Sequence, residues 1–230
     1  LHALEVINDF AAVAWAVPGL TPDDVLSVGA RPSGRQEGVR AVVGPGTGLG
    51  VAAVKRGADG LVVIESEGGH VGFSPTDDTE LDVLRFLMRR HPRVSIERLL
   101  SGAGLVSLYH AQCALSGSVP ELKTPEQVTA AAQQGDALAN GAIRAFCAIF
   151  GSFAGDVALM FGAWDGVYLA GGVLAHVLDG PGGAVFRARF EAKGRFADRL
   201  AQVPTLRIMR EDVGSLGAAM YGVRHGTTAY

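Results

Sequence analysis

Short apolar runs and longer amphipathic stretches divide the chain into an early group of strands, a helical middle and a final strand–helix alternation. Apolar runs of about four to eight residues, bounded by Gly, Pro or Asp, are typical of buried strands. By this criterion strands are expected at residues 4–7, 40–43, 51–55, 61–65, 166–170 and 205–209. Strands mixed with helices in this order predict an α/β chain.

Apolar positions three or four residues apart predict the helices, and several starts carry capping residues. The clearest start is Thr124-Pro125-Glu126-Gln127, which has a cap, a proline in the first turn and Gln three residues after the cap. The longest helix is expected over 136–160, and its recurring small residues predict a closely packed neighbour. Further helices are expected at residues 10–17, 77–90, 96–100, 102–115, 173 onward, 186–190 and 214–222.

A glycine-rich turn lies between the second and third expected strands, with the sequence Gly44-Pro45-Gly46-Thr47-Gly48-Leu49-Gly50. The hairpin signal Asp59-Gly60 follows, so these strands are expected to form an antiparallel meander. Backbone N–H groups of glycines can surround a phosphate, and Thr47 adds a hydroxyl donor. A phosphate cradle and a plain tight hairpin both explain the turn. It matches neither a Walker A loop, which needs Lys, nor a Rossmann turn, which needs a following helix.

The segment Glu67-Gly68-Gly69-His70 comes directly after an expected strand, where binding sites often form. A carboxylate and an imidazole on either side of two glycines suit a polar neutral ligand such as a sugar. Two potential ligands are too few for a zinc site. A turn with no role in binding is the alternative.

Two further carboxylates are candidates for chemistry. Asp9 follows Asn8 at the end of an expected strand, where it could take a proton from a hydroxyl. It also precedes a helix, so it is equally suited to be the N-cap of that helix. Glu97 lies in the first turn of another expected helix, where a carboxylate is also favoured by the helix dipole alone.

Gly171 and Gly172 follow the apolar strand expected at 166–170 and precede a helix. This arrangement lets a flat ring or a phosphate approach the start of the helix. Close packing between the strand and the helix is the alternative explanation.

Composition and charge exclude several classes of protein. Hydrophobic residues make up 48% of the 230 positions and charged residues 19%, so the chain is not disordered. The 32 glycines are about twice the usual share, in agreement with many tight turns. The net charge of −3, with no basic block, argues against a nucleic-acid partner.

The two cysteines and the apolar runs indicate the cellular setting. Cys113 and Cys147 both lie in apolar, helix-like segments, so they are expected to be buried free thiols in a reducing compartment. A disulfide framework and a four-cysteine zinc site are excluded. Charged residues and glycines interrupt the longest apolar stretch, 142–160, so no membrane span of about 18 residues is expected. No signal peptide is recognised.

Taken together, these segments resemble the bacterial glucokinase family, in the hexokinase branch of the actin-like ATPase fold. No cysteine occurs near His70, unlike the zinc motif of the repressor-type sugar kinases. The matched segments follow the order of the family and are Ile7-Asn8-Asp9-Phe10-x-Ala12-Val13, 44–51, Glu67-Gly68-Gly69-His70-Val71-x-Phe73, Glu97-Arg98-x-Leu100-Ser101-Gly102-x-Gly104-Leu105, Ala170-Gly171-Gly172, Phe190-Glu191-x-Lys193-Gly194-Arg195-Phe196 and Gly214-x-Leu216-Gly217-Ala218.

The resemblance implies a role for each candidate. Members of the family transfer the γ-phosphoryl group of ATP to the 6-hydroxyl of glucose with Mg²⁺, and act as cytoplasmic homodimers that bind neither nucleic acid nor membranes. Asp9 would be the general base, and no residue is assigned as a metal ligand. The other implied roles are binding of glucose hydroxyls by Asn8, Glu67, His70 and Glu97, a phosphate loop at Gly44, Gly46, Thr47 and Gly48, and an adenosine-side motif at Gly171 and Gly172.

The resemblance also implies a ribonuclease-H-like large domain of the actin/hexokinase type, with a mixed sheet and flanking helices. Family members begin with an Asp-x-Gly-Gly-Thr phosphate loop, and this sequence has none. Residues 1–20 are therefore expected to be the end of a small domain, 21–209 the large domain and 210–230 a helix returning to the small domain. The stretch 17–38, rich in Pro, Gly and Asp, is expected to be the connection between the domains.

Two other functions fit the same sequence. Without the first phosphate loop, the chain could be a non-catalytic sugar-binding or regulatory module. The same frame could also serve a kinase for another hexose. The residues do not distinguish ATP, ADP and polyphosphate as the phosphoryl donor.

Overall fold

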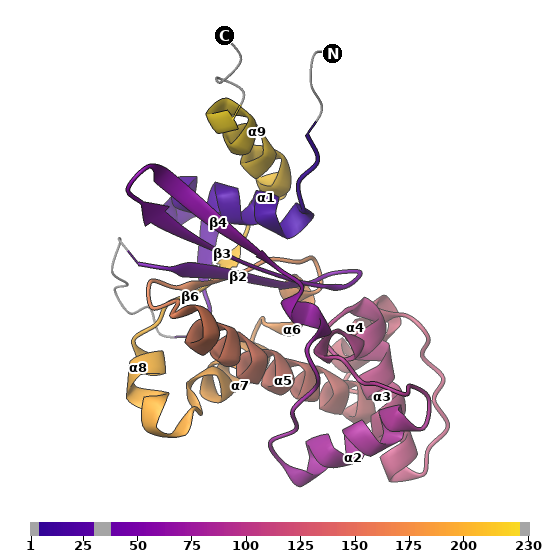
Figure 1. Ribbon diagram of the computed structural model, residues 1–230. Helices are drawn as coiled ribbons and strands as arrows, with labels where there is room; N and C mark the ends of the chain where they lie inside the picture. The colour runs from indigo at the N-terminus through magenta and orange to yellow at the C-terminus, as the bar shows by residue number, and fades with distance from the viewer. Residues whose placement is uncertain (1–4, 30–37, 226–230) are drawn as a thin grey trace.

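The fold is built on a six-stranded sheet with helices on both faces (Figure 1). The structure is a computed structural model that describes residues 5–29 and 38–225. The strand order is β1-β6-β5-β2-β3-β4. The predicted α/β class is confirmed, with strands β1 (Val25–Ser27), β2 (Arg40–Pro45), β3 (Leu49–Gly57), β4 (Gly60–Ser66), β5 (Val167–Leu169) and β6 (Thr205–Ile208).

The sheet is mixed, and its antiparallel half is the predicted meander. β2 pairs antiparallel with β3, and β3 pairs antiparallel with β4. β5 lies parallel to both β2 and β6, while β1 is antiparallel to β6. The carboxyl ends of β2 and β5 therefore meet at the same edge of the sheet, which brings the glycine-rich turn close to Gly171.

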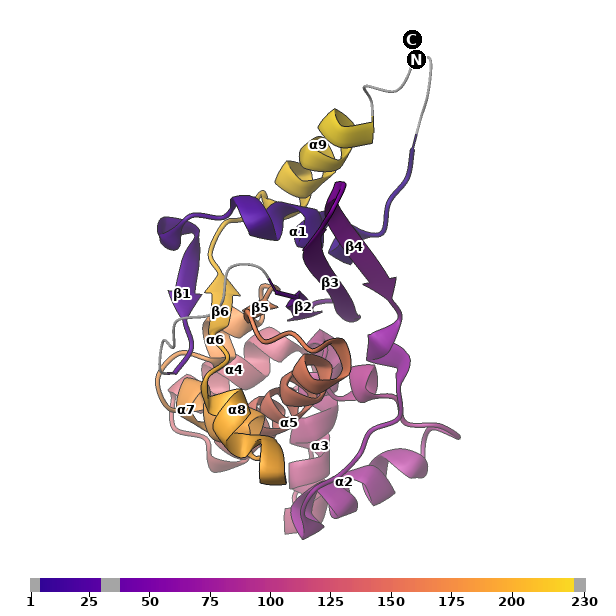
Figure 2. The same ribbon diagram turned by 60° about the vertical axis from the view of Figure 1, so that its left-hand side comes forward.

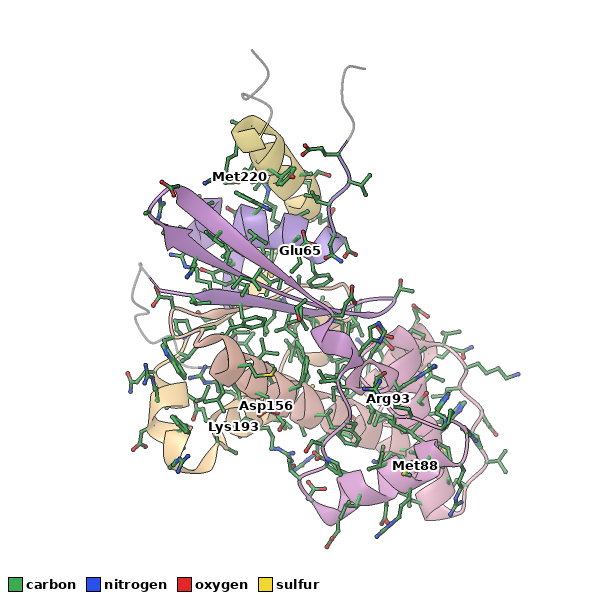
Figure 3. The ribbon with its side chains drawn as sticks, viewed as in Figure 1. Glu65, Met88, Arg93, Asp156, Lys193 and Met220 are labelled. Carbon is green, nitrogen blue, oxygen red and sulfur yellow. The ribbon has the colours of Figure 1, made fainter. Side chains whose placement is uncertain are left out.

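One face of the sheet is covered by a layer of helices around α5 (Figure 1). The small residues of α5 bring α7 very close, as predicted: a Cβ on Gly151 would lie 2.1 Å from the carbonyl oxygen of Phe186. Beyond α7, Lys193 Nζ donates to Asp156 Oδ1 at 2.6 Å (Figure 3). This layer contains α2 (Asp78–Met88), α3 (Gly102–Ser116), α4 (Pro125–Gln133), α5 (Ala137–Phe161) and α7 (Pro181–Glu191).

The other face of the sheet carries α1 (Asp9–Ala16) and α9 (Val213–His225), which pack against each other (Figure 2). A Cβ on Gly217 would lie 1.6 Å from the carbonyl oxygen of Ala12, so the two backbones are in direct contact. The rings of Trp15 and Tyr221 meet edge to face, with their centroids 5.6 Å apart. The first and the last described helices thus form one unit on the sheet.

Two predictions of secondary structure were wrong. Residues 5–7 of the strand expected at 4–7 are not in a strand, and Leu4 lies outside the described residues. Val6 is 89% exposed, with no neighbouring strand beside it in the described part of the chain. The expected connection 17–38 contains β1, and its residues 30–37 lie outside the described ranges. The pairing of β1 with β6, about 180 residues later, is the reason that local composition did not reveal it.

The remaining elements are short. Val173 is the N-cap of a one-turn helix, and residues 68–70 form a 3₁₀ turn that the sequence did not predict. These elements are α6 (Leu174–Val177), α8 (Ala197–Ala201), η1 (Val17–Gly19), η2 (Pro22–Asp24), η3 (Gly68–His70), η4 (Ile96–Arg98) and η5 (Gly194–Phe196).

Helix α5 corrects the expectation that no stretch of the chain is long and apolar enough to span a membrane. By length and composition it is apolar enough to cross a membrane, because Arg144 and Asp156 do not suffice to lower its mean hydropathy. In this fold 56% of its most apolar window is buried, against α3, α4 and α7. Its apolar surface therefore builds the core of the layer beneath the sheet.

Both cysteines are buried as free thiols, as predicted, and we expect them to be inert in the folded protein. Burial raises the pKa of the Cys147 thiol to about 12, and this thiol donates to the carbonyl of Val177 at 3.2 Å. Only the thiolate is nucleophilic, so Cys113 and Cys147 are expected to release no colour from Ellman's reagent at pH 8 until guanidinium is added. Reaction of Cys147 at the rate of a free thiol in the native protein would contradict this.

Candidate active site

The glycine-rich turn is the tip of the β2–β3 hairpin. The Gly46 N–H donates to the carbonyl of Gly48 at 2.8 Å, and the Gly102 N–H donates to the carbonyl of Gly46 at 3.0 Å. The first bond closes the turn, and the second ties it to the start of α3. Thr47 is exposed at the tip between them. The Gly46 N–H, one of the groups expected to hold phosphate, is thus already engaged in a hydrogen bond within the turn.

Glu97 is fixed to the tip of the same hairpin. It lies in η4, and its Oε2 accepts from the Leu49 N–H at 3.0 Å. A Cβ on Gly48 would lie 2.6 Å from this oxygen, so the glycine makes room for the carboxylate. Glu97 is therefore held beside the glycine-rich turn, in addition to being favoured by the dipole of its own short helix.

Glu67 and His70 are brought next to Glu97. His70 Nε2 lies 3.9 Å from Glu67 Oε2, and His70 Nδ1 lies 3.9 Å from Glu97 Oε1. Between them, Gly69 packs so tightly that its Cβ would lie 2.1 Å from the carbonyl oxygen of Leu49. The imidazole and two carboxylates, from two turns of the chain, thus share one small region beside the hairpin.

Sequence reasoning did not find the residue that holds this turn in place. Arg93 Nη2 donates to the carbonyl of His70 at 2.7 Å (Figure 3 labels this arginine). The Ile96 N–H also donates to the carbonyl of Val71 at 2.9 Å, which fixes the turn to the segment of Glu97. Nothing in the sequence around Arg93 indicates this contact.

Asn8 and Asp9 lie at the start of α1, and the N-cap of this helix is not Asp9, the alternative role considered for that residue. The N-cap is Asn8, whose Oδ1 accepts from the N–H groups of Phe10 at 2.9 Å and Ala11 at 3.1 Å. Asp9 is the first helical residue, and its Oδ1 also accepts from the Phe10 N–H, at 2.8 Å. Both side chains are exposed. Capping therefore does not require the Asp9 carboxylate, and its Oδ2 has room for a further partner.

Phe10 connects this helix start to the hairpin. Its ring packs against Gly44 and Gly50, which face each other across β2 and β3. Asp9, one residue before Phe10, is thereby held at the same hairpin that carries Glu97. The sugar-side candidates thus converge on one structural element.

Gly171 and Gly172 lie on the opposite side of the hairpin. Gly171 has φ of +127°, and its Cβ would lie 2.1 Å from the carbonyl oxygen of Pro45, so only glycine fits there. Both glycines line a pocket of about 550 Å³, which also contains Arg207 and Arg210. The size is in the range of small-molecule sites. Both guanidinium groups are already paired, Arg207 with Asp179 at 2.8 Å and Arg210 with Asp212 at 2.6 Å.

The comparisons with known proteins decide the family. The family model described as Glucokinase matches residues 1–225 of this chain. The chain belongs to the glucokinase family. It is 46% identical over 224 residues to a glucokinase of Xanthomonas campestris pv. campestris, which covers 96% of the chain and 67% of that relative. It is also 46% identical to a glucokinase of Stenotrophomonas maltophilia, over 95% of the chain and 66% of the relative.

Solved structures agree with this assignment. A glucokinase from an Antarctic psychrotroph superposes with a TM-score of 0.86 at 34% identity, over 95% of this chain and 68% of that one. The Balamuthia mandrillaris glucokinase, solved with glucose, gives a TM-score of 0.78 at 20% identity, over 95% and 65% of the two chains. The predicted glucokinase family, the predicted fold class and the predicted class of enzyme, an ATP-dependent hexose kinase, are confirmed. The chain spans about two thirds of the length of these glucokinases.

Proposed function

We propose that the whole protein transfers the γ-phosphoryl group of ATP to the 6-hydroxyl of glucose. The observation that supports this most is the gathering of Glu67, His70 and Glu97 within 3.9 Å contacts beside a glycine-rich hairpin. Carboxylates and an imidazole suit a neutral polyol, because each can pair with a sugar hydroxyl, and such a site rejects sugars that lack one. With Asn8 at the start of α1, these residues are the proposed glucose ligands.

Asp9 is the proposed general base. Its Oδ1 is held by the Phe10 N–H, and its Oδ2 is free to accept the proton of the 6-hydroxyl. The sugar oxygen then forms a bond to the γ-phosphorus, the bond from that phosphorus to the β–γ bridging oxygen breaks, and ADP leaves. Such a transfer depends mainly on positioning and on stabilising charge.

The proposed nucleotide site lies on both sides of Pro45. The turn that carries Gly44, Gly46, Thr47 and Gly48 faces the phosphates, and Gly171 and Gly172 face the adenosine, whose pocket has a volume of about 550 Å³. A structural neighbour, a Streptomyces griseus glucokinase solved with glucose and AMPPNP, shares this fold with a TM-score of 0.63 at 20% identity. ATP is the proposed donor on these grounds.

Mg²⁺ is proposed to accompany ATP. Among the described residues no group of three or more His, Cys, Asp or Glu side chains is arranged to hold a metal ion. In kinases Mg²⁺ is held largely by substrate phosphates and water, with one or two carboxylates, so a larger group of protein ligands is not required. When bound, Mg²⁺ would neutralise charge on the phosphates.

The organisation of the whole protein is part of the proposal. The contact between α1 and α9 supports a small lobe that includes residues 1–20 and 210–230, with residues 21–209 as the large lobe. The buried free thiols support a reducing, cytoplasmic setting. A homodimer without nucleic-acid or membrane partners is proposed from the family resemblance.

The test is release of ADP by the whole purified protein. We expect ADP release from ATP to require both glucose and Mg²⁺, and to be absent with galactose. Mannose, fructose and N-acetylglucosamine as competitors identify a kinase for another hexose. ADP release that ignores the sugar would overturn the proposal. Protection from thermal unfolding by glucose without any turnover would instead support the sugar-binding module.

A further inference from the structure

We infer that Phe10 is a positioning residue for Asp9, and that Gly50 lacks a side chain because, with Gly44 opposite it, it forms the slot for the Phe10 ring. The inference rests on the proposed function, since it concerns how the general base is held. It gives Gly50, the last of the four glycines of the turn, a role other than phosphate binding.

The slot is defined by the register of the hairpin. Gly44 and Gly50 are direct partners across β2 and β3. A Cβ on Gly50 would lie 1.8 Å from Cδ2 of Phe10. A Cβ on Gly44 would lie 2.2 Å from the carbonyl oxygen of Ala170 and 2.7 Å from Cζ of the Phe10 ring. These distances are far below van der Waals contact, so any larger residue at Gly50 must displace the ring.

The same residue holds the carboxylate through its backbone. The Phe10 N–H donates to Asp9 Oδ1 at 2.8 Å and to Asn8 Oδ1 at 2.9 Å. Phe10 therefore contacts the hairpin with its ring, and the proposed base and a proposed glucose ligand with its amide. If a methyl group at position 50 displaces the ring together with the start of α1, the Phe10 amide and the Asp9 carboxylate move with it.

The arrangement joins two parts of the reaction that lie far apart in the sequence. Gly46 and Thr47 at the tip of the hairpin are only two or three residues from the slot at Gly44, whereas Asp9 is adjacent to the ring that fills the slot. The base and the phosphate loop are thus held at a fixed separation. Displacements of about 1 Å at a reacting group can lower a rate by about 100-fold, so this separation matters for turnover.

The test is a double-mutant cycle in the whole protein, with Gly50→Ala, Phe10→Ala and the pair. We expect Gly50→Ala to lower kcat about 10- to 100-fold, with the KM for ATP within about threefold of the wild type. Phe10→Ala should lower kcat to a similar extent. In the pair, Gly50→Ala should add nothing further, because an empty slot accommodates the new methyl group. The coupling should therefore be seen in kcat as well as in the free energy of unfolding.

Leu20→Ala is the matched control, because Leu20 packs on the same apolar cluster as Phe10 but lies outside the proposed site. It should weaken folding and leave kcat unchanged. The inference is overturned if Gly50→Ala and Phe10→Ala weaken folding as Leu20→Ala does and keep the kcat of the wild type. A wild type without sugar-dependent ADP release would overturn the proposed function and the positioning of a base with it. If Gly50→Ala and Phe10→Ala change the free energy of unfolding additively, the Phe10 ring does not occupy a slot at Gly50, and this part of the inference is overturned.

Discussion

Replacing Asp9 by Asn is expected to lower kcat by about 100- to 10,000-fold, the usual contribution of a general base. Asn has the shape of Asp, and its amide oxygen can still accept from the Phe10 N–H, as Asp9 Oδ1 does at 2.8 Å. It cannot take a proton from the sugar. Because Asn8 supplies the cap of α1, the helix should persist, and glucose affinity should change little. Steady-state turnover together with glucose titration measures both quantities.

Asp78→Asn is the matched control for this substitution. Asp78 is also the first residue of a helix, it is also exposed, and its helix is also capped by the preceding residue, Asp77. Asp78→Asn should remove the same favourable interaction with a helix dipole and leave kcat unchanged. A turnover in Asp9→Asn above about a tenth of the wild-type value would show that another group accepts the proton.

The largest loss of stability is expected from Arg187→Met, about 3–5 kcal/mol in the free energy of unfolding. The Arg187 guanidinium donates to the carbonyls of Val203 at 2.7 Å and Ala201 at 2.9 Å, and pairs with Glu191 Oε1 at 2.5 Å. Its side chain is only 7% exposed. Met fills the space of the aliphatic part but leaves buried acceptors without donors, and each of these costs free energy.

Chemical denaturation of the purified protein measures this loss. Arg85→Met is the control, because Arg85 is 69% exposed and its pair with Asp82 is a surface ion pair. Exposed pairs contribute about 0–1 kcal/mol, so the control should unfold at nearly the denaturant concentration of the wild type. Equal midpoints for Arg187→Met and Arg85→Met would refute the structural role of Arg187.

Local signals in the sequence were sufficient for most of the sheet and the helices. Asp59-Gly60 marks a hairpin, and it is found between β3 and β4. Thr124 and Gln127 mark a capping box, and both of its hydrogen bonds are present at the start of α4. These elements are predictable because the residues that determine them are neighbours in the chain.

Elements that depend on distant partners were not predictable. Val25–Ser27 forms a strand because it pairs with Thr205–Ile208, and three residues among prolines and aspartates give no local sign of it. Residues 5–7 show the reverse case, an apolar run that has no strand beside it among the described residues. Pairing across the sheet, and not local propensity, decided both cases.

The same contrast between local signals and contacts of distant residues applies to the candidate site. Glu67, His70 and Glu97 were recognised by type and position, and the structure brings them together. The approach of Glu97 to the other two depends on how two turns that are distant in the sequence pack together, which no local pattern encodes. Phe10 appears in the sequence as an ordinary apolar helix residue, and only the opposing glycines of β2 and β3 reveal its contact.

The contact between α1 and α9 has a consequence during synthesis. Ala12 and Gly217, which touch in the folded protein, are separated by about 205 residues. At about 5–20 residues per second, a ribosome needs about 10–40 s to pass from one to the other. Throughout that interval the surface of α1 that faces α9 has no native cover, and it is available to chaperones. A nascent chain that stalls before Gly217 therefore leaves the α9-facing side of its first helix exposed, even when the sheet has formed against the other side.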